Sequence, residues 1–184
     1  MDYCFRTGRY QGTAFQQQTV QDIIKQWENY ANITFRKVDN QNATIRITFD
    51  PNAGSYSALG TDARLPVFNG RNTLNLGWIL EGAENADENR GTILHEFGHV
   101  LGLNHEHQSP ARGGKLHLKE DGESLVSPKC NYLSLMNALS AMIWAYGQPP
   151  NNWSEQQVRQ QIINLLNKQN LSNFSELDFD SIMM

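Results

Sequence analysis

Residues 95–105 read HEFGHVLGLNH, which is the pattern HExxHxxGxxH. On a helix, His95 and His99 share one face, because residues four apart lie one turn above each other. Two imidazoles placed in this way can bind one zinc ion, each at about 2.0–2.1 Å. Glu96 follows the first histidine and is not needed as a ligand, so it is expected to act as a general base.

Gly102 stands where the chain has to leave the helix and turn back. A residue with positive φ makes that turn at little cost, and glycine allows it. The turn lets His105 reach the ion that His95 and His99 bind. Three neutral ligands leave the zinc ion strongly Lewis acidic and leave room for a water molecule. The segment therefore predicts one zinc site with three histidine ligands.

The two remaining histidines and the two cysteines fall outside this pattern. We expect His107 and His117 to be solvated loop histidines, the usual state of an isolated histidine in a polar segment. Cys4 and Cys130 can form one disulfide or stay reduced, and the sequence leaves both alternatives open. Neither cysteine belongs to a CxxC pair, so a cysteine-based metal site is not expected.

The composition excludes several classes of protein. The chain has 184 residues and a formal net charge of −4, and its charges are scattered. A nucleic-acid partner is not expected without a basic face. Membrane insertion is not expected either, since the most apolar stretch, residues 132–146, is too short to span a bilayer.

The location of the protein is read from its amino end and its glycosylation sequons. Met1 is followed by Asp2 and by early arginines, so no signal peptide is recognised, and the chain is either cytoplasmic or a trimmed mature domain. Five Asn-x-Ser/Thr sequons occur where chance gives about two. They weakly favour a secreted protein of eukaryotic origin, and an Asn-rich microbial chain with accidental sequons is the equal alternative.

Apolar spacing predicts the elements of the amino-terminal half. A helix is expected over Thr19–Tyr30, where Thr19 and Asp22 resemble a capping box. Alternation of apolar and polar residues predicts five strands, at Tyr3–Phe5, Ile33–Val38, Ala43–Phe49, Ser55–Leu59 and Thr73–Leu80. One strand, one helix and then several strands indicate an α+β fold in which a helix face covers a mixed sheet.

The rest of the chain is expected to be helical or irregular. The zinc motif lies on a helix over Ala86–Leu101, which Asn85 can cap. The polar region Gln108–Pro128 predicts a long loop, and Tyr132–Tyr146 predicts a buried helix. A last helix begins after Ser154, which forms a capping box with Gln157. We expect a single domain over residues 1–184, with an amino-terminal subdomain over 1–102 and a carboxy-terminal one over 103–184.

The zinc motif resembles that of the metzincin zinc endopeptidases, which pair HExxHxxGxxH with a downstream methionine turn. Ser181-Ile182-Met183-Met184 is similar to that turn, and Met183 matches the methionine that lies beneath the metal site in the family. The resemblance implies a mixed, twisted sheet, an active-site helix and a backing helix. It also implies a mainly helical or loop carboxy-terminal subdomain, with zinc in the cleft between the two subdomains.

Within the metzincins, the chain is most similar to astacin-like peptidases of bacterial or fungal type. Glu106 follows the third histidine, as it does in astacins, and residues 73–78 and 152–154 also resemble that group. Two features depart from the family. The tyrosine that follows the methionine turn would be residue 185, where this chain has already ended. The segment over Ala111–Leu133 is also longer than expected.

The resemblance implies a zinc-dependent metalloendopeptidase that hydrolyses internal peptide bonds by metal-activated water, with Glu96 as the general base. Its partners would be protein or peptide substrates, with an inhibitor or prodomain as a further implied partner, and its location would be extracellular. By the same resemblance, extended substrate would pair with an edge strand, formed by Ser55, Tyr56, Ser57, Ala58 and Leu59. An ordinary interior strand is the alternative for this segment.

Two alternatives stay open beside an active peptidase. One is a catalytically weak or inactive zinc-binding module that keeps the peptidase fold for protein binding, which the missing tyrosine favours. The other is a shortened piece of an active parent. Glu96 favours activity, because a purely structural zinc site needs no base and usually has four protein ligands.

Overall fold

The structure is a computed structural model that describes residues 1–112, 146–147, 152–164, 166, 169, 171 and 181–183. The chain divides into two compact units, of which the first comprises residues 1–104 with Met183 and the second begins at His105. Most of the loop predicted over Gln108–Pro128 lies outside the described residues. So does the helix predicted over Tyr132–Tyr146, apart from Tyr146 itself.

The first unit is built on a mixed five-stranded sheet with the order β2-β1-β3-β5-β4. Its strands span Asp2–Phe5, Arg36–Lys37, Ile45–Thr48, Ser55–Ser57 and Leu74–Leu76, from β1 to β5 in chain order. All neighbours are parallel except β4, which pairs antiparallel with β5. The expected α+β class with a mixed sheet is therefore confirmed, and β4 is an edge strand.

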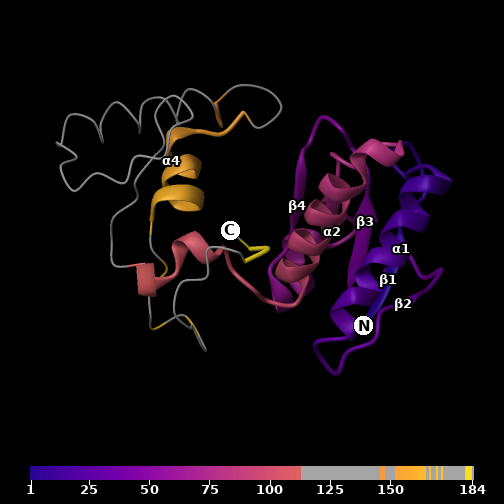
Figure 1. The fold of residues 1–184 in the computed structure, drawn as a ribbon, viewed down its shortest axis with the longest axis horizontal. Helices are drawn as coiled ribbons and strands as arrows, with labels where there is room; N and C mark the ends of the chain where they lie inside the picture. The colour runs from indigo at the N-terminus through magenta and orange to yellow at the C-terminus, as the bar shows by residue number, and fades with distance from the viewer. Residues whose placement is uncertain are drawn as a thin grey trace. The chain divides into compact units, whose positions relative to one another are not determined.

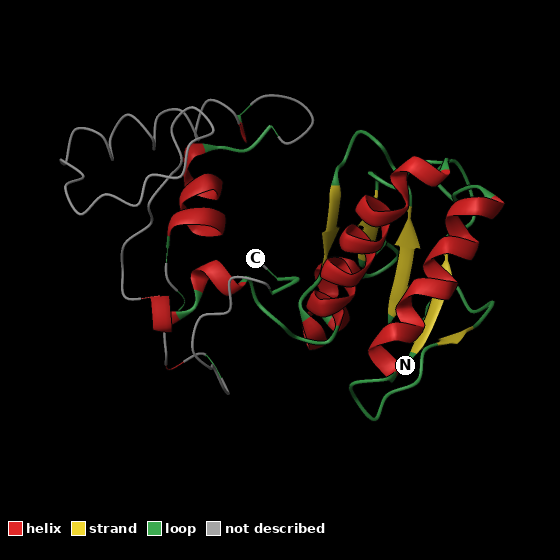
Figure 2. Ribbon diagram, viewed as in Figure 1, coloured by secondary structure: helices red, strands yellow, loops and turns green. Residues whose placement is uncertain are grey.

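Two helices cover one face of this sheet. Figures 1 and 2 show α1 (Ala14–Glu28) and α2 (Ala86–Val100) side by side over the strands. Their apolar residues pack onto the helix-facing side chains of β1, β3 and β5. The largest fully buried side chains of this core include Ile24, Ile45, Leu74, Ile93 and Phe97. The core thus fixes α2, the helix that carries the first part of the zinc motif.

Helix α1 starts five residues before the predicted position. The expected cap at Thr19 is wrong, because Thr13 forms the capping box, with the Gln16 main-chain N–H donating to its hydroxyl. The apolar pattern could not predict the first turn, because the glutamines at residues 16–18 add nothing to the apolar stripe. Gln16 also donates to the Ile79 carbonyl, so this polar turn is fixed by contacts distant in sequence.

The strands predicted over Ala43–Phe49 and Ser55–Leu59 are limited to Ile45–Thr48 and Ser55–Ser57, and two other predicted strands lose more residues. The strand predicted over Ile33–Val38 is reduced to Arg36–Lys37, because the main-chain N–H of Phe35 donates to the Glu28 carboxylate instead of to a neighbouring strand. The strand predicted over Thr73–Leu80 is limited to Leu74–Leu76. A buried polar residue, Asn75, occupies the middle of that strand.

Helix α2 follows the prediction closely, except at its cap. The side chain of Asn85 does not cap the helix, and its amide donates to the Glu81 carbonyl instead. Asn89 is buried and makes two hydrogen bonds with the main chain of Leu80. These bonds secure the first turn of α2 to the segment that leaves β5.

The second unit contains α4 (Glu155–Val158), with Ser154 as its cap and Gln157 completing the predicted capping box. The helix continues as a π-helical turn over Arg159–Ile163 and ends at Asn164. No helix among the described residues is long and apolar enough to cross a membrane. In the first unit, Cys4 is a free and buried thiol, and Cys130 lies outside the described residues.

Candidate metal centre

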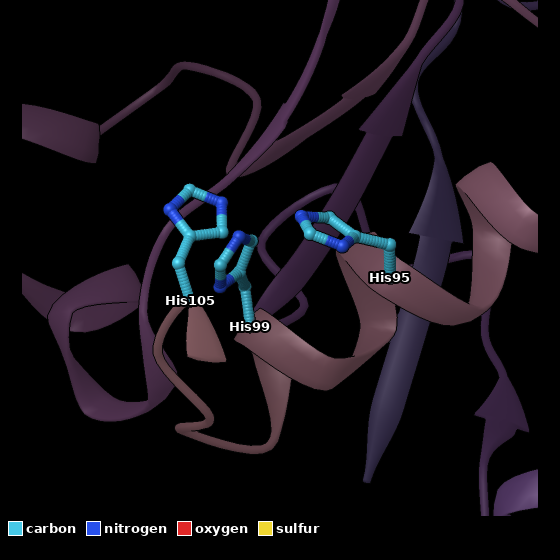
Figure 3. A group of neighbouring side chains, drawn as sticks. All are labelled: His95, His99 and His105. Atoms are coloured by element: carbon cyan, nitrogen blue, oxygen red, sulfur yellow. The ribbon is translucent and has the colours of Figure 1, made fainter. Parts of the chain in front are cut away.

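Helix α2 brings two of the three predicted ligands together. His95 and His99 lie one turn apart, with their ring centroids 4.8 Å from each other and their planes at 86°. His105 joins them from the segment after the helix, as Figure 3 shows. Ligand nitrogens of the three histidines all lie within 4.8 Å of one another. Three imidazoles gathered in this way can share one divalent ion.

The turn after α2 positions the third ligand. Gly102 has a φ of 93°, and its N–H donates to the His99 carbonyl, while the N–H of Leu103 donates to the Gly98 carbonyl. This pair of bonds is a Schellman motif, which satisfies the last carbonyls of the helix. The chain therefore reverses within two residues. Gly102 acts in the turn, as the sequence predicted, and not as a ligand.

The same turn orients the ring of His99. Its Nδ1 lies 2.8 Å from the Leu103 carbonyl oxygen. Because a carbonyl can only accept, Nδ1 carries the proton, and in the neutral ring Nε2 keeps its lone pair for a metal ion. Burial holds the pKa of His99 below its ordinary value of 6.5, and the nearby His95 acts in the same direction. The neutral ligand form is thus favoured.

Glu96 is buried beside the first ligand. Its side chain is 5% exposed, and Oε2 has no hydrogen-bond partner among the described residues. Burial raises the pKa of this carboxyl to about 8. A buried carboxyl oxygen without a partner is costly unless it meets a cation or a polar ligand. The orphaned oxygen and the three imidazoles of the same segment fit a resident metal ion.

Met183 closes the underside of this segment of helix within the first unit. It is buried, and its sulfur lies so close to Gly98 that a β-carbon on residue 98 would be 2.3 Å away. The structure therefore places Met183 directly beneath the turn that separates His95 from His99. Ile182 and Met183 lie in a turn, and Ser181 precedes that turn.

His107 is half-exposed in a short 3-10 turn, and it makes two contacts that the expectation of a solvated loop histidine did not include. The ring of His107 stacks on that of His105, with centroids 5.1 Å apart and planes at 20°. Its Nε2 lies 3.0 Å from the Gln161 carbonyl oxygen. No periodic pattern marks His107 in the sequence, and its position two residues after a ligand is the one available signal. His117 lies outside the described residues.

The predicted substrate strand begins as an edge strand. Residues 55–57 form β4, and Ala58 and Leu59 continue beyond it. The Gly54 carbonyl accepts from Gly77, and the Ala58 N–H donates to Thr73, so the even-numbered residues face β5. Main-chain groups alternate along a strand. The main-chain N–H and C=O groups of Ser55 and Ser57 therefore point away from β5, toward the open edge of the sheet.

Comparison with known proteins supports these observations. The profile of the astacin family of peptidases matches residues 4–122. Tolloid-like protein 1 from Mus musculus and its Homo sapiens counterpart are each 29% identical to the chain over 100 residues. That alignment covers 54% of this chain and 9% of each relative, so the chain matches a small part of their length.

Solved structures of myroilysin are similar along nearly the whole chain. One has a TM-score of 0.71 and 31% identity, and the alignment covers 99% of this chain and 75% of the other. A second has a TM-score of 0.64 and 30% identity, with 99% of this chain and 67% of the other covered. The similarity thus extends beyond the residues that the family profile matches.

Proposed function

The chain belongs to the astacin family of metallopeptidases, and from this premise we propose that it is a zinc endopeptidase that hydrolyses internal peptide bonds of proteins. We assign His95, His99 and His105 as the zinc ligands. The observation that carries the proposal is the gathering of these three imidazoles, whose ligand nitrogens lie within 4.8 Å of one another. It is supported by Glu96, which follows His95 in the sequence and whose buried Oε2 has no hydrogen-bond partner among the described residues. Zinc suits this donor set, because imidazole nitrogens are common zinc ligands and three of them leave a position open.

Glu96 is proposed as the general base. A bound zinc ion would supply Lewis acidity that lowers the pKa of water and polarises the scissile carbonyl. Glu96 takes a proton from the attacking water and passes it to the nitrogen of the departing amine as the C–N bond breaks. Burial raises the pKa of this carboxyl and so favours its protonated form in the metal-free chain. A nearby dication favours the carboxylate form that the base needs.

Strand β4 is proposed to receive the substrate. An extended peptide can add to the free edge of a sheet through main-chain hydrogen bonds. Ser55 and Ser57 present such groups on the outer side of β4, and Ala58 and Leu59 lead away from it. This mode of binding recognises the peptide backbone, which accounts for an action on proteins as a class.

An extracellular location is proposed on the five sequons alone.

The alternative proposal is an inactive zinc-binding module that binds other proteins. A module of that kind gains nothing from a buried carboxyl oxygen that has no hydrogen-bond partner in the part of the chain that the structure describes, since such an oxygen costs stability. Glu96 therefore favours the enzyme over the module. A protein that binds zinc and leaves substrates intact would establish the module.

The decisive experiment compares the wild type with Glu96→Gln on a fluorogenic peptide and on casein. We expect the wild type to cleave both, to stop in a chelator and to recover when zinc is restored. Glu96→Gln should bind one zinc ion per chain and lose activity by about 10²–10⁴-fold, the usual effect of removing a general base. Equal rates for the two proteins would refute the role of Glu96.

A further inference from the structure

The third ligand is held by a compact set of contacts inside the second unit. His105 is the first residue of that unit, and it leads into a short 3-10 turn over Glu106–Gln108. The Gln108 N–H donates to the His105 carbonyl at 3.0 Å. His105 comes from a loop and not from a helix, so its ring needs other means of orientation than those available to His95 and His99.

His107 supplies one of these means. Its ring lies nearly parallel to that of His105, at 5.1 Å between centroids. The stack is itself anchored, because His107 Nε2 lies 3.0 Å from the Gln161 carbonyl oxygen. A carbonyl can only accept, so Nε2 carries the proton in this contact. His107 is thus fixed at one edge while its face rests on the ligand ring.

Gln108 fixes the adjoining main chain. It is buried, and its amide donates to the carbonyls of Gln160 at 2.6 Å and of Asn164 at 3.2 Å. In return, the Leu166 N–H donates to the Gln108 carbonyl at 2.9 Å. The last carbonyls of a helix have no partner within it. The end of the π-helical turn therefore offers acceptors, and residues 107 and 108 occupy two of them, beside the carbonyl of the cap residue Asn164.

We propose that His107 is a positioning residue that holds the His105 ring in the orientation required to bind the metal ion. This inference rests on the proposed zinc site. Holding a ligand ring before the ion binds removes the entropy cost of ordering it, and supporting residues around metal ligands commonly affect metal affinity by about 10–100-fold. In this role His107 touches neither the substrate nor the reacting atoms, and it acts through His105.

The test separates the stack from the hydrogen bond with three variants at one position. His107→Phe keeps an aromatic ring and loses the donor, His107→Gln keeps a donor and loses the ring, and His107→Ala loses both. The matched control is Gln161→Ala, because it removes the side chain of Gln161 and keeps the carbonyl that accepts from His107. Zinc dissociation constants are measured by competition with a chromogenic chelator, beside the melting temperature of each metal-free protein.

We expect His107→Ala to bind zinc about tenfold or more weakly, with Gln161→Ala unchanged and the metal-free melting temperatures close to the wild type. A loss in His107→Gln alone assigns the effect to the stack, and a loss in His107→Phe alone assigns it to the hydrogen bond. If His107→Phe and His107→Gln both bind zinc like the wild type, the inference is overturned, whether or not His107→Ala folds. A wild type that binds no zinc would instead refute the proposed function.

Discussion

The sulfur of Met183 lies against Gly98 on the helix that also carries His95 and His99. A side chain at residue 98 would occupy the space that the methionine fills, since a β-carbon there would be 2.3 Å from the sulfur and 3.6 Å from the ring of Trp27. Gly91 lies on the same helix, and a β-carbon there would meet no atom within 4 Å. The two glycines therefore serve different purposes.

Replacing each of these glycines by alanine should have opposite consequences. Gly91→Ala should raise the free energy of unfolding by about 0.5–1 kcal/mol, because alanine is the better helix former. Gly98→Ala gains the same amount and loses about 1–3 kcal/mol to overpacking against Met183. Urea denaturation should find Gly98→Ala less stable than Gly91→Ala by about 1–3 kcal/mol. Two variants of equal stability would show that Met183 yields without cost.

Strand β4 gives a prediction for substrate binding. In Ser57→Pro the main-chain N–H that faces the open edge is lost, and KM should rise by about tenfold, the effect of one hydrogen bond, at a similar melting temperature. Ser57→Ala keeps that N–H and should match the wild type. Ala58→Pro removes the bond from Ala58 to the Thr73 carbonyl, and it should destabilise the fold instead. Peptide kinetics and thermal melts provide the measurements. An unaltered KM in Ser57→Pro would contradict strand addition.

Asn75 is predicted to be the polar residue that contributes most to the stability of the turn leading into β4. It is 1% exposed, and its amide donates to the carbonyls of Asp50 and Gly54, while its oxygen accepts from Thr48 and from the Asp50 N–H. Asn75→Leu removes the partner of the Asp50 N–H and one of the bonds that each of the other three groups makes, and it should cost about 2–3 kcal/mol.

Asn52 serves as the control for this variant. It lies in the same turn with its side chain exposed, so Asn52→Ala should change the free energy of unfolding by less than about 0.5 kcal/mol. Chemical denaturation checks both proteins. A loss below about 1 kcal/mol in Asn75→Leu would mean that the turn finds other partners.

The burial of Glu96 leads to a prediction for how the stability of the metal-free protein depends on pH. Its carboxyl has a pKa of about 8 in the folded chain, against an ordinary value of 4.5, because burial disfavours the charge. Between these values the folded state binds the proton that the unfolded state has lost. The free energy of unfolding should therefore fall as the pH rises from 4.5 to 8, by at most about 1.4 kcal/mol per pH unit.

The matched variant isolates this effect. Glu96→Gln cannot titrate at this position, so it lacks the fall in the free energy of unfolding that is expected for the wild type. The difference in stability between the two proteins should therefore grow across the same pH range. Denaturation of both metal-free proteins at pH 5, 6.5 and 8 provides the measurement. A difference that stays constant with pH would show that the Glu96 carboxyl reaches solvent in the folded chain.

Local patterns were enough to predict the metal-binding helix. The stripe of Ile93, Phe97 and Val100 is buried as its spacing indicates, and Gly102 ends the helix through its positive φ. The reason is that each of these features depends on residues within a few positions of one another. The mixed class of the sheet also followed, because strands that precede and follow a helix tend to share one sheet.

Features that depend on distant residues could not be predicted. The order β2-β1-β3-β5-β4 places β1 between two later strands, and no signal inside β1 states its neighbours. The start of α1 depends on Thr13 and on the distant carbonyl that accepts from Gln16. The contacts of His107 could not be predicted for the same reason, since its partner at Gln161 lies far along the chain.

The helix-ending turn at Gly102 has a consequence for how the protein takes up its ion. Because the main-chain bonds of the turn also bring the Leu103 carbonyl to His99, one tautomer of that imidazole is selected as soon as the chain folds. Metal capture at this ligand then requires no proton relocation and little rearrangement. The rate of loading should consequently be governed by the approach of the ion and by the later ligand at residue 105.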